Sequence, residues 1–146
     1  MNIIFEIAGN KCIYMPLVTW FAIQAFKVIT DLVKTRKFNF KRLLGAGGMP
    51  SSHSAVVCCL AMLVGKNSGF SSSEFAIATV LACVVMYDAA GVRRAAGKQA
   101  RLLNKLMDTP GLSTLEVKEK LVEVLGHTPI QVIVGAIIGI IVGAIF

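Results

Sequence analysis

The two histidines of this chain stand in local sequences that suit phosphate chemistry. His53 closes a run of glycines, a proline and two serines that begins at Gly47, and His127 shortly precedes Pro129. A helix is predicted to begin at both places, and helix N-termini attract anions. Cleavage of a phosphate ester without a metal needs cations, backbone N–H groups, a nucleophile and a proton donor for the leaving alkoxide. Two imidazoles can supply the nucleophile and the proton donor.

A structural interpretation of the run before His53 stands beside the chemical one. Its serines can cap the following helix by accepting backbone N–H groups, and its imidazole can cap or pack. The local residues alone leave both interpretations open.

The composition indicates a membrane protein. Of the 146 residues, 55% are hydrophobic and 16% charged, and the mean hydropathy is +0.72. A water-soluble protein of this length could not bury so much apolar surface in one core, so part of it must face lipid.

Four apolar stretches predict spanning helices in a single domain over residues 1–146. A glycine-rich loop or re-entrant turn, Leu43 to Ser52, precedes the second span. The spacing of Thr114 to Leu125 predicts an amphipathic cytosolic helix with Gly126 as its C-terminal cap. The expected fold is therefore an all-α polytopic membrane bundle. Its predicted spans are Ile13 to Val33, a helix from Ser51–Ser54 to Val64, Phe75 to Val92, and Pro129 to Phe146.

The basic residues predict the orientation of these spans. Ten of the fifteen Lys and Arg residues fall in two blocks, Lys34 to Arg42 and Arg93 to Lys105, each beside an apolar stretch. This pattern is typical of cytoplasmic loops, and nucleic acid is not expected as a partner because no aromatic residues interleave the basic ones. The alternating spans then bring the following residues to the cytoplasmic end: Lys27, His53, Asp88, Arg93, Arg94 and His127.

The small residues of the apolar stretches are expected to be structural. The four cysteines show no metal-ligand spacing and no disulfide framework, and no cofactor is expected. Three glycines of the last span recur every four residues, which lets another backbone approach either within the chain or in a homo-oligomer. These glycines are Gly135, Gly139 and Gly143.

These motifs resemble the type 2 phosphatidic acid phosphatase superfamily, and most closely its small divergent branch of bacterial and plant membrane proteins. Pro50 to His53 matches the superfamily's Pro-Ser-Gly-His with Ser in place of Gly. His127 and Gly135 match its third motif, although Gln131 stands where that motif has Asp. The likeness to the divergent branch runs through residues 24–27, 35–37, 47–55, 88–100 and 125–139.

The resemblance implies a metal-independent phosphatase with assigned roles for both histidines. His127 would be the nucleophile that forms a phosphohistidine, and His53 would be the general acid toward the leaving group. It also implies that phosphate is held by basic residues and hydroxyls, namely Lys27, Arg36, Arg93 or Arg94, Ser51 and Ser52.

Gln131 is the main departure, because an amide cannot stabilise an imidazolium as a carboxylate does. Gln131 can still accept a hydrogen bond from His127 and fix its tautomer. Asp88 or Glu123 is the alternative carboxylate, although Asp88 could instead pair with an arginine. The arginine pair also lies far from His127 in sequence, and the usual first motif is absent.

The expected function is hydrolysis of a phosphomonoester on a lipid similar to phosphatidylglycerophosphate or phosphatidate. The expected setting is a bacterial inner (plasma) membrane, with the site facing the cytoplasm and membrane lipids as partners. A rival is a non-enzymatic protein that binds or flips phospholipids, which the missing carboxylate favours. A third interpretation is a scaffold that assembles through the glycine stripe.

Overall fold

The computed structural model describes residues 2–36, 47–108, 121–123 and 125–146, and every regular element in these ranges is a helix. The all-α fold is thereby confirmed. Residues 37–46 of the first basic block and glycine-rich loop lie outside the described residues. The helices are α1 (Ile3–Gly9), α2 (Lys11–Thr35), α4 (Ser52–Ser68), α5 (Ser73–Ala90), α6 (Val92–Met107) and α7 (Pro129–Ile145).

Local capping signals fix where the long helices begin. The Ser51 side chain accepts from the Ser54 N–H at the start of α4, and the Ser72 side chain accepts from the Phe75 N–H at the start of α5. Thr128 caps α7, with Pro129 as its first residue. A short polar side chain at these positions satisfies one of the N–H groups that the first helical turn leaves without an acceptor. The starts predicted near Ser51–Ser54 and at Pro129 are confirmed, and α5 begins two residues before the predicted Phe75.

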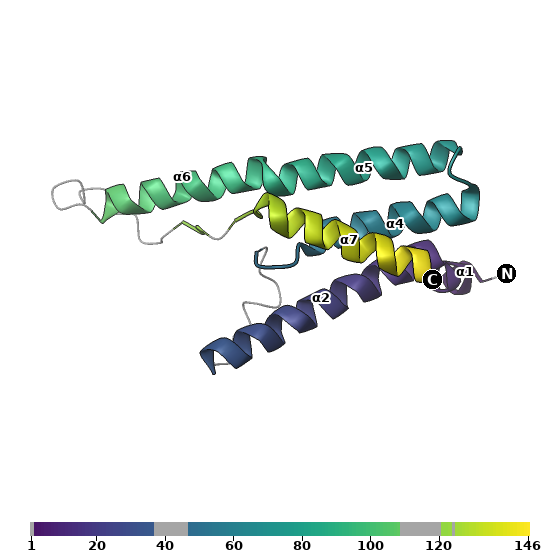
Figure 1. Ribbon diagram of the computed structural model, residues 1–146, viewed down its shortest axis with the longest axis horizontal. Helices are drawn as coiled ribbons and strands as arrows, with labels where there is room; N and C mark the ends of the chain where they lie inside the picture. The colour runs from purple at the N-terminus through teal and green to yellow at the C-terminus, as the bar shows by residue number, and fades with distance from the viewer. Residues whose placement is uncertain (1, 37–46, 109–120, 124) are drawn as a thin grey trace.

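Helix α4 is the centre of the bundle, and α7 packs beside it in the same direction (Figure 1). A Cβ atom added at Gly135, Gly139 or Gly143 would lie under 3.0 Å from a backbone carbonyl oxygen of α4 or of its N-terminal cap. Those oxygens belong to Ser51, Ala55 and Cys59 in turn, so both helices advance four residues at each contact. Only glycine permits this approach. The stripe therefore serves packing within one chain, and a homo-oligomer stays a prediction that would need another surface.

Two other helices cover α4. Helix α2 runs antiparallel to it, with Met15 packed against Cys59 and Leu63, and Thr19 in contact with the Cys59 sulfur at 3.7 Å. Helix α5 returns from the α4–α5 turn and packs Ala82 against Val57 and Cys58.

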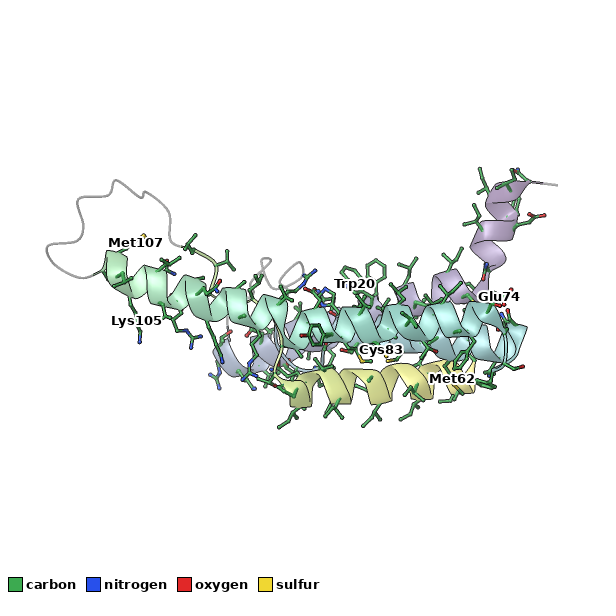
Figure 2. All side chains as sticks on the ribbon, turned by 90° about the horizontal axis from the view of Figure 1, so that it is seen from above. Trp20, Met62, Glu74, Cys83, Lys105 and Met107 are labelled. Carbon is green, nitrogen blue, oxygen red and sulfur yellow. The ribbon has the colours of Figure 1, made fainter. Side chains whose placement is uncertain are left out.

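Helix α6 continues α5 past Gly91, and the two lie almost along one line (Figure 1). No helix is predicted here from the sequence, in which Arg93 to Lys105 is only a basic block beside an apolar stretch. Helix α6 is the amphipathic helix of the described chain, and Lys105 points away from the bundle (Figure 2). The sequence predicts a helix over Thr114 to Leu125. Residues 114–120 and 124 of it lie outside the described residues. The rest, 121–123 and 125, is not helical, so the prediction is wrong for these residues.

Gly126 is likewise not a helix cap. It has a positive φ of 84° and presses against the backbone of Arg93 and Arg94, where a Cβ would clash. Its role is a close approach to the start of α6.

Two helical stretches are long and apolar enough to cross a membrane: α2, and the 35-residue run Ser73–Met107 formed by α5 and α6. Helix α7 is apolar but has 17 residues. Its long apolar side chains point away from the bundle (Figure 2), and Ile133 and Ile141 are more than half exposed. Such a surface is favourable in contact with lipid. At 1.5 Å per residue the α5–α6 run measures about 52 Å, so part of it must extend beyond a hydrocarbon core of about 30 Å.

Replacing Gly139 with leucine should separate α4 from α7. The new side chain would meet the Ala55 carbonyl, and overpacking of this kind typically costs about 1–3 kcal/mol. Thermal unfolding in detergent, followed by circular dichroism, should show a lower midpoint than wild type. Gly9→Leu is the matched control, because nothing lies within 4 Å of a Cβ at Gly9. Equal midpoints for the two variants would contradict this account of the α4–α7 contact.

Candidate active site

The structure brings His53 and His127 together. Their ring centroids are 5.8 Å apart, with the planes inclined by 63°. His53 is the second residue of α4, and His127 lies two residues before α7. The two rings meet because α4 and α7 run parallel, which places both helix N-termini at the same end of the bundle.

Backbone hydrogen bonds hold the two histidine segments in place. The His127 N–H donates to the Ala89 carbonyl at 2.9 Å, which ties His127 to the last turn of α5. The Ser51 N–H donates to the Gln131 carbonyl at 3.0 Å, which ties the α4 cap to α7. Three helix ends are thus joined around the histidine pair.

Gln131 orients the His127 ring. Its Oε1 accepts from the Thr128 N–H at 2.9 Å and lies 3.3 Å from His127 Nδ1. Because an N–H can only donate, the amide oxygen must face Thr128, and Nδ1 must then carry the proton that it shares with Oε1. This leaves the lone pair on Nε2, an atom buried without a hydrogen-bond partner among the described residues. This contact favours the tautomer that carries its proton on Nδ1, which is consistent with the role that the sequence suggests for Gln131.

Burial keeps the His127 imidazole neutral. Its side chain is 2% exposed, and this loss of water is the main cause that lowers its pKa from the ordinary 6.5. The positive charge of Lys27 acts in the same direction, while contacts with Gln131 and the Gly48 backbone partly oppose it. At neutral pH the ring is an uncharged base.

Several charged groups surround the pair. Lys27 of α2 is buried at 4% exposure, and together with Arg93 and Asp88 it lies within electrostatic range of the His53 ring. Arg93 Nε is 2.5 Å from Asp88 Oδ2, so Asp88 pairs with an arginine instead of contacting either imidazole. This is the structural alternative that the sequence left open for Asp88.

The remaining predicted phosphate ligands differ in burial and in their place relative to the histidine pair. Ser51 and Ser52 are buried at the start of α4, where Ser51 is engaged as the helix cap. Arg94 is partly buried beside Arg93, and Arg36 is exposed at the C-terminal cap of α2. Within the described ranges, no contact joins Arg36 to the histidines. No group of three His, Cys, Asp or Glu residues able to hold a metal occurs in the same ranges.

Comparison with known proteins assigns this arrangement to a family. The model of the divergent PAP2 family matches residues 8–142. The chain belongs to that family. It is also 37% identical to the uncharacterized membrane protein YuiD of Bacillus subtilis (strain 168), over 93% of each chain. No solved structure matches. With its long apolar helices and this relative, the chain is a helical membrane protein related to the PAP2 phosphatases.

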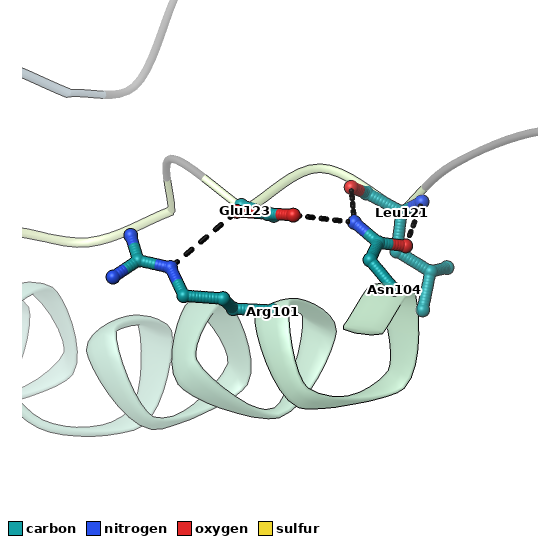
Figure 3. A network of polar contacts seen from close by, with 4 residues as sticks. All are labelled: Arg101, Asn104, Leu121 and Glu123. Carbon is teal, nitrogen blue, oxygen red and sulfur yellow. Dashed lines mark hydrogen bonds and ion pairs between the residues drawn. The ribbon is translucent and has the colours of Figure 1, made fainter. Parts of the chain in front are cut away.

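Glu123 does not serve as the carboxylate partner of His127 in this family member. It lies 3.4 Å from Arg101 Nε and accepts from Asn104 Nδ2 at 2.8 Å, both on α6 (Figure 3). The sequence offers Glu123 because it lies four residues before His127, a spacing that brings two side chains together on a helix, but residues 123 and 125 are not helical. Without that helix, the side chain faces α6 instead.

Asn104 is a residue that the sequence analysis missed. It is 3% exposed, and besides Glu123 its amide bonds both the N–H and the carbonyl of Leu121, at 3.0 and 2.9 Å (Figure 3). Near the other end of α6, Gly97 admits the backbone of Glu123 and Leu125. These contacts hold the segment that leads to His127 against α6. The sequence carries no signal for this role, because the burial of Asn104 follows only from the fold.

Replacing Asn104 with leucine should loosen this segment without unfolding the bundle. The change leaves the N–H and carbonyl of Leu121 without their partner, at a cost of about 1–3 kcal/mol. Hydrogen exchange should become faster over residues 121–127 and stay unchanged in α4. Asn67→Leu, at an exposed asparagine on the far end of α4, is the control. Unchanged exchange over 121–127 would show that Asn104 does not hold the segment.

Proposed function

We propose that this protein is an integral-membrane phosphatase that removes the phosphomonoester group of a phosphatidylglycerophosphate- or phosphatidate-like lipid. The observation that supports this most strongly is the buried imidazole pair at the shared N-terminal end of α4 and α7. Family membership and the unpartnered Nε2 of His127 agree with it.

The proposed reaction has two steps that conserve atoms and protons. Nε2 of His127 attacks phosphorus, the ester P–O bond breaks, and protonated His53 gives its proton to the leaving alkoxide. Neutral His53 then takes a proton from water, whose oxygen attacks the phosphohistidine, and the P–N bond breaks to release inorganic phosphate. The proton on Nδ1 of His127 stays on that nitrogen throughout and is donated to Gln131 Oε1 as a hydrogen bond.

Positive groups around the pair would hold the phosphate. Lys27 and Arg93 act electrostatically on the histidine pair, Arg94 follows Arg93 on α6, and Arg36 caps the C-terminus of α2. The N–H groups of Ser52 and His53 lie in the first turn of α4, where a helix offers them no acceptor and its dipole favours an anion. Ser51 would help by capping α4 and so fixing the first turn that faces the phosphate, and Ser52 would donate a hydrogen bond to the phosphate through its hydroxyl.

An amide at Gln131 would make this enzyme slower than a relative with a carboxylate. Gln131 keeps the tautomer and orientation of His127, but it does not offset the positive charge that develops on the ring during attack. The rival function, phospholipid binding or flipping without hydrolysis, uses the same phosphate site.

His127→Gln should abolish phosphate release from phosphatidate in detergent, by about a thousandfold or more, because it removes the nucleophile. Wild type should also form a phosphoenzyme that survives alkali and is lost in acid, and the variant should not. Since burial lowers the pKa of His127 below 6.5, activity should persist to pH values below 6.5 before protonation of His127 abolishes it.

Asn67→Ala, at the far end of the bundle, is the control and should keep full activity. If His127→Gln releases phosphate at the wild-type rate, the phosphatase proposal is wrong. Lipid binding without any release by wild type would support the rival.

We also propose that α2, α4, α5 and α7 each cross the membrane, with the histidine pair at the cytoplasmic end. The described helices alternate in direction along α2, α4 and α5, and α7 runs parallel to α4. The basic residues of α6 lie at the end of the bundle that carries the histidines. The positive-inside rule assigns that end to the cytoplasm.

A membrane-impermeant maleimide should test this orientation in intact cells. A cysteine at Lys98, on α6, should react only after permeabilisation, and a cysteine at Asn67, in the last turn of α4, should react from outside. The reverse pattern would place the site on the outer face.

A further inference from the structure

An apolar groove runs along the bundle between α2 and α7. Its volume is about 570 Å³. One wall is the stripe Val134, Ile138 and Val142 of α7, and the other is formed by α2 residues that include Ala22, Ile23 and Phe26. The stripe on α7 alone rises about 12 Å along the helix.

The groove exists because α2 and α7 both pack on α4 but scarcely on each other. Figure 1 shows their ribbons close together where α7 ends and spread apart toward the end where α7 begins. The groove therefore opens toward the histidine end of the bundle.

A small polar hollow adjoins the wide end of the groove. It has a volume of about 110 Å³ and is lined by Lys27, Asp31 and Gly48, together with three residues that also line the groove: Thr30, Lys34 and Met49. Two of its lining residues lie close enough to His127 to affect the pKa of its imidazole: the charge of Lys27 lowers that pKa, and the Gly48 backbone raises it. The hollow and the groove thus adjoin through shared lining residues, with two lysines and one aspartate, and so a net positive charge, at the polar end and mainly apolar walls along the rest.

This polarity matches a molecule that has an anionic head and a single long tail beside it. We propose that the α2–α7 groove holds one acyl chain of the lipid phosphate substrate, with its phosphate entering through the polar hollow toward His127. The proposal rests on the proposed function and names the part of the protein that recognises a lipid.

The groove would act by positioning. An acyl chain already surrounded by lipid gains little hydrophobic free energy from apolar protein walls. Holding the chain instead fixes the depth and direction of the phosphate relative to Nε2, and a displacement of about 1 Å at a reacting centre can cost about a hundredfold in rate. The groove should therefore matter for lipid substrates and not for small water-soluble ones.

The experiment uses phosphatidate with a photoreactive diazirine in its acyl chain, in phosphatidylcholine vesicles that contain the full-length protein. After illumination, mass spectrometry should find adducts on α2 and α7 residues of the groove. Adducts spread over other lipid-facing residues, such as Ile77 and Val80 of α5, or formed mainly with another protein molecule, would overturn the proposal.

Ile138→Trp should fill the groove, and Ile137→Trp is the matched control because Ile137 is its neighbour and lies outside the groove. Ile138→Trp should lose the groove adducts and lower kcat/KM for long-chain phosphatidate about tenfold or more, while hydrolysis of glycerol 3-phosphate changes less than about twofold. If Ile138→Trp does not fold, Ala22→Phe fills the groove from α2 and should cause the same loss of adducts and of kcat/KM for phosphatidate. Equal loss on both substrates would overturn the proposal.

The two proposals can fail separately. If wild type hydrolyses neither substrate, the phosphatase function is wrong, and the adduct map still decides whether the groove holds a lipid chain. If wild type hydrolyses both and the filled variants retain lipid hydrolysis and groove adducts, the groove proposal alone is wrong.

Discussion

The close parallel contact of α4 and α7 is the constraint on which the site depends. Glycines at every fourth position of α7 admit the carbonyl oxygens of α4 and its cap, so the two backbones lie almost against each other. Parallel packing puts two positive helix ends side by side, which is electrostatically unfavourable for the apoprotein. The Ser51–Gln131 hydrogen bond and the glycine contacts hold them there. A bound phosphate would relieve the repulsion, so the packing that costs stability would also favour the proposed anion site.

Gln131 joins that packing to the chemistry. Its backbone carbonyl accepts from the Ser51 N–H, and its backbone N–H donates to the Thr128 hydroxyl. Its side-chain oxygen accepts from the Thr128 N–H and contacts Nδ1 of His127. The first turn of α7 therefore cannot form without also orienting the imidazole. A carboxylate could accept the same hydrogen bonds and would add negative charge. The amide at this position preserves the geometry of the site and gives up part of its electrostatics.

Features with local causes were predictable from the sequence, and features that depend on distant packing were not. The starts of α4, α5 and α7 follow from Ser51, Ser72 and the Thr-Pro pair at the start of α7. The meeting of the two histidines follows from helices that alternate in direction along the chain. The partner of Glu123 and the role of Asn104 depend on the segment 121–127 folding back on α6, which no local pattern encodes. The α2–α7 groove similarly depends on the angle between two helices that share only a neighbour.

The burial of the histidine pair also limits how a substrate can reach it. His127 is almost fully covered, with the last turn of α5 bonded to its N–H, Gly126 pressed on α6 and the Arg93–Asp88 ion pair nearby. On the α2 side, the hollow at Lys27 and Gly48 opens into the apolar groove instead. A water-soluble ester gains nothing from that path, whereas a lipid can keep its chain among apolar side chains while its head reaches the cations. In the proposed enzyme, the geometry of α2, which packs mainly on α4, would therefore control access to the histidine pair that α4 and α7 bring together.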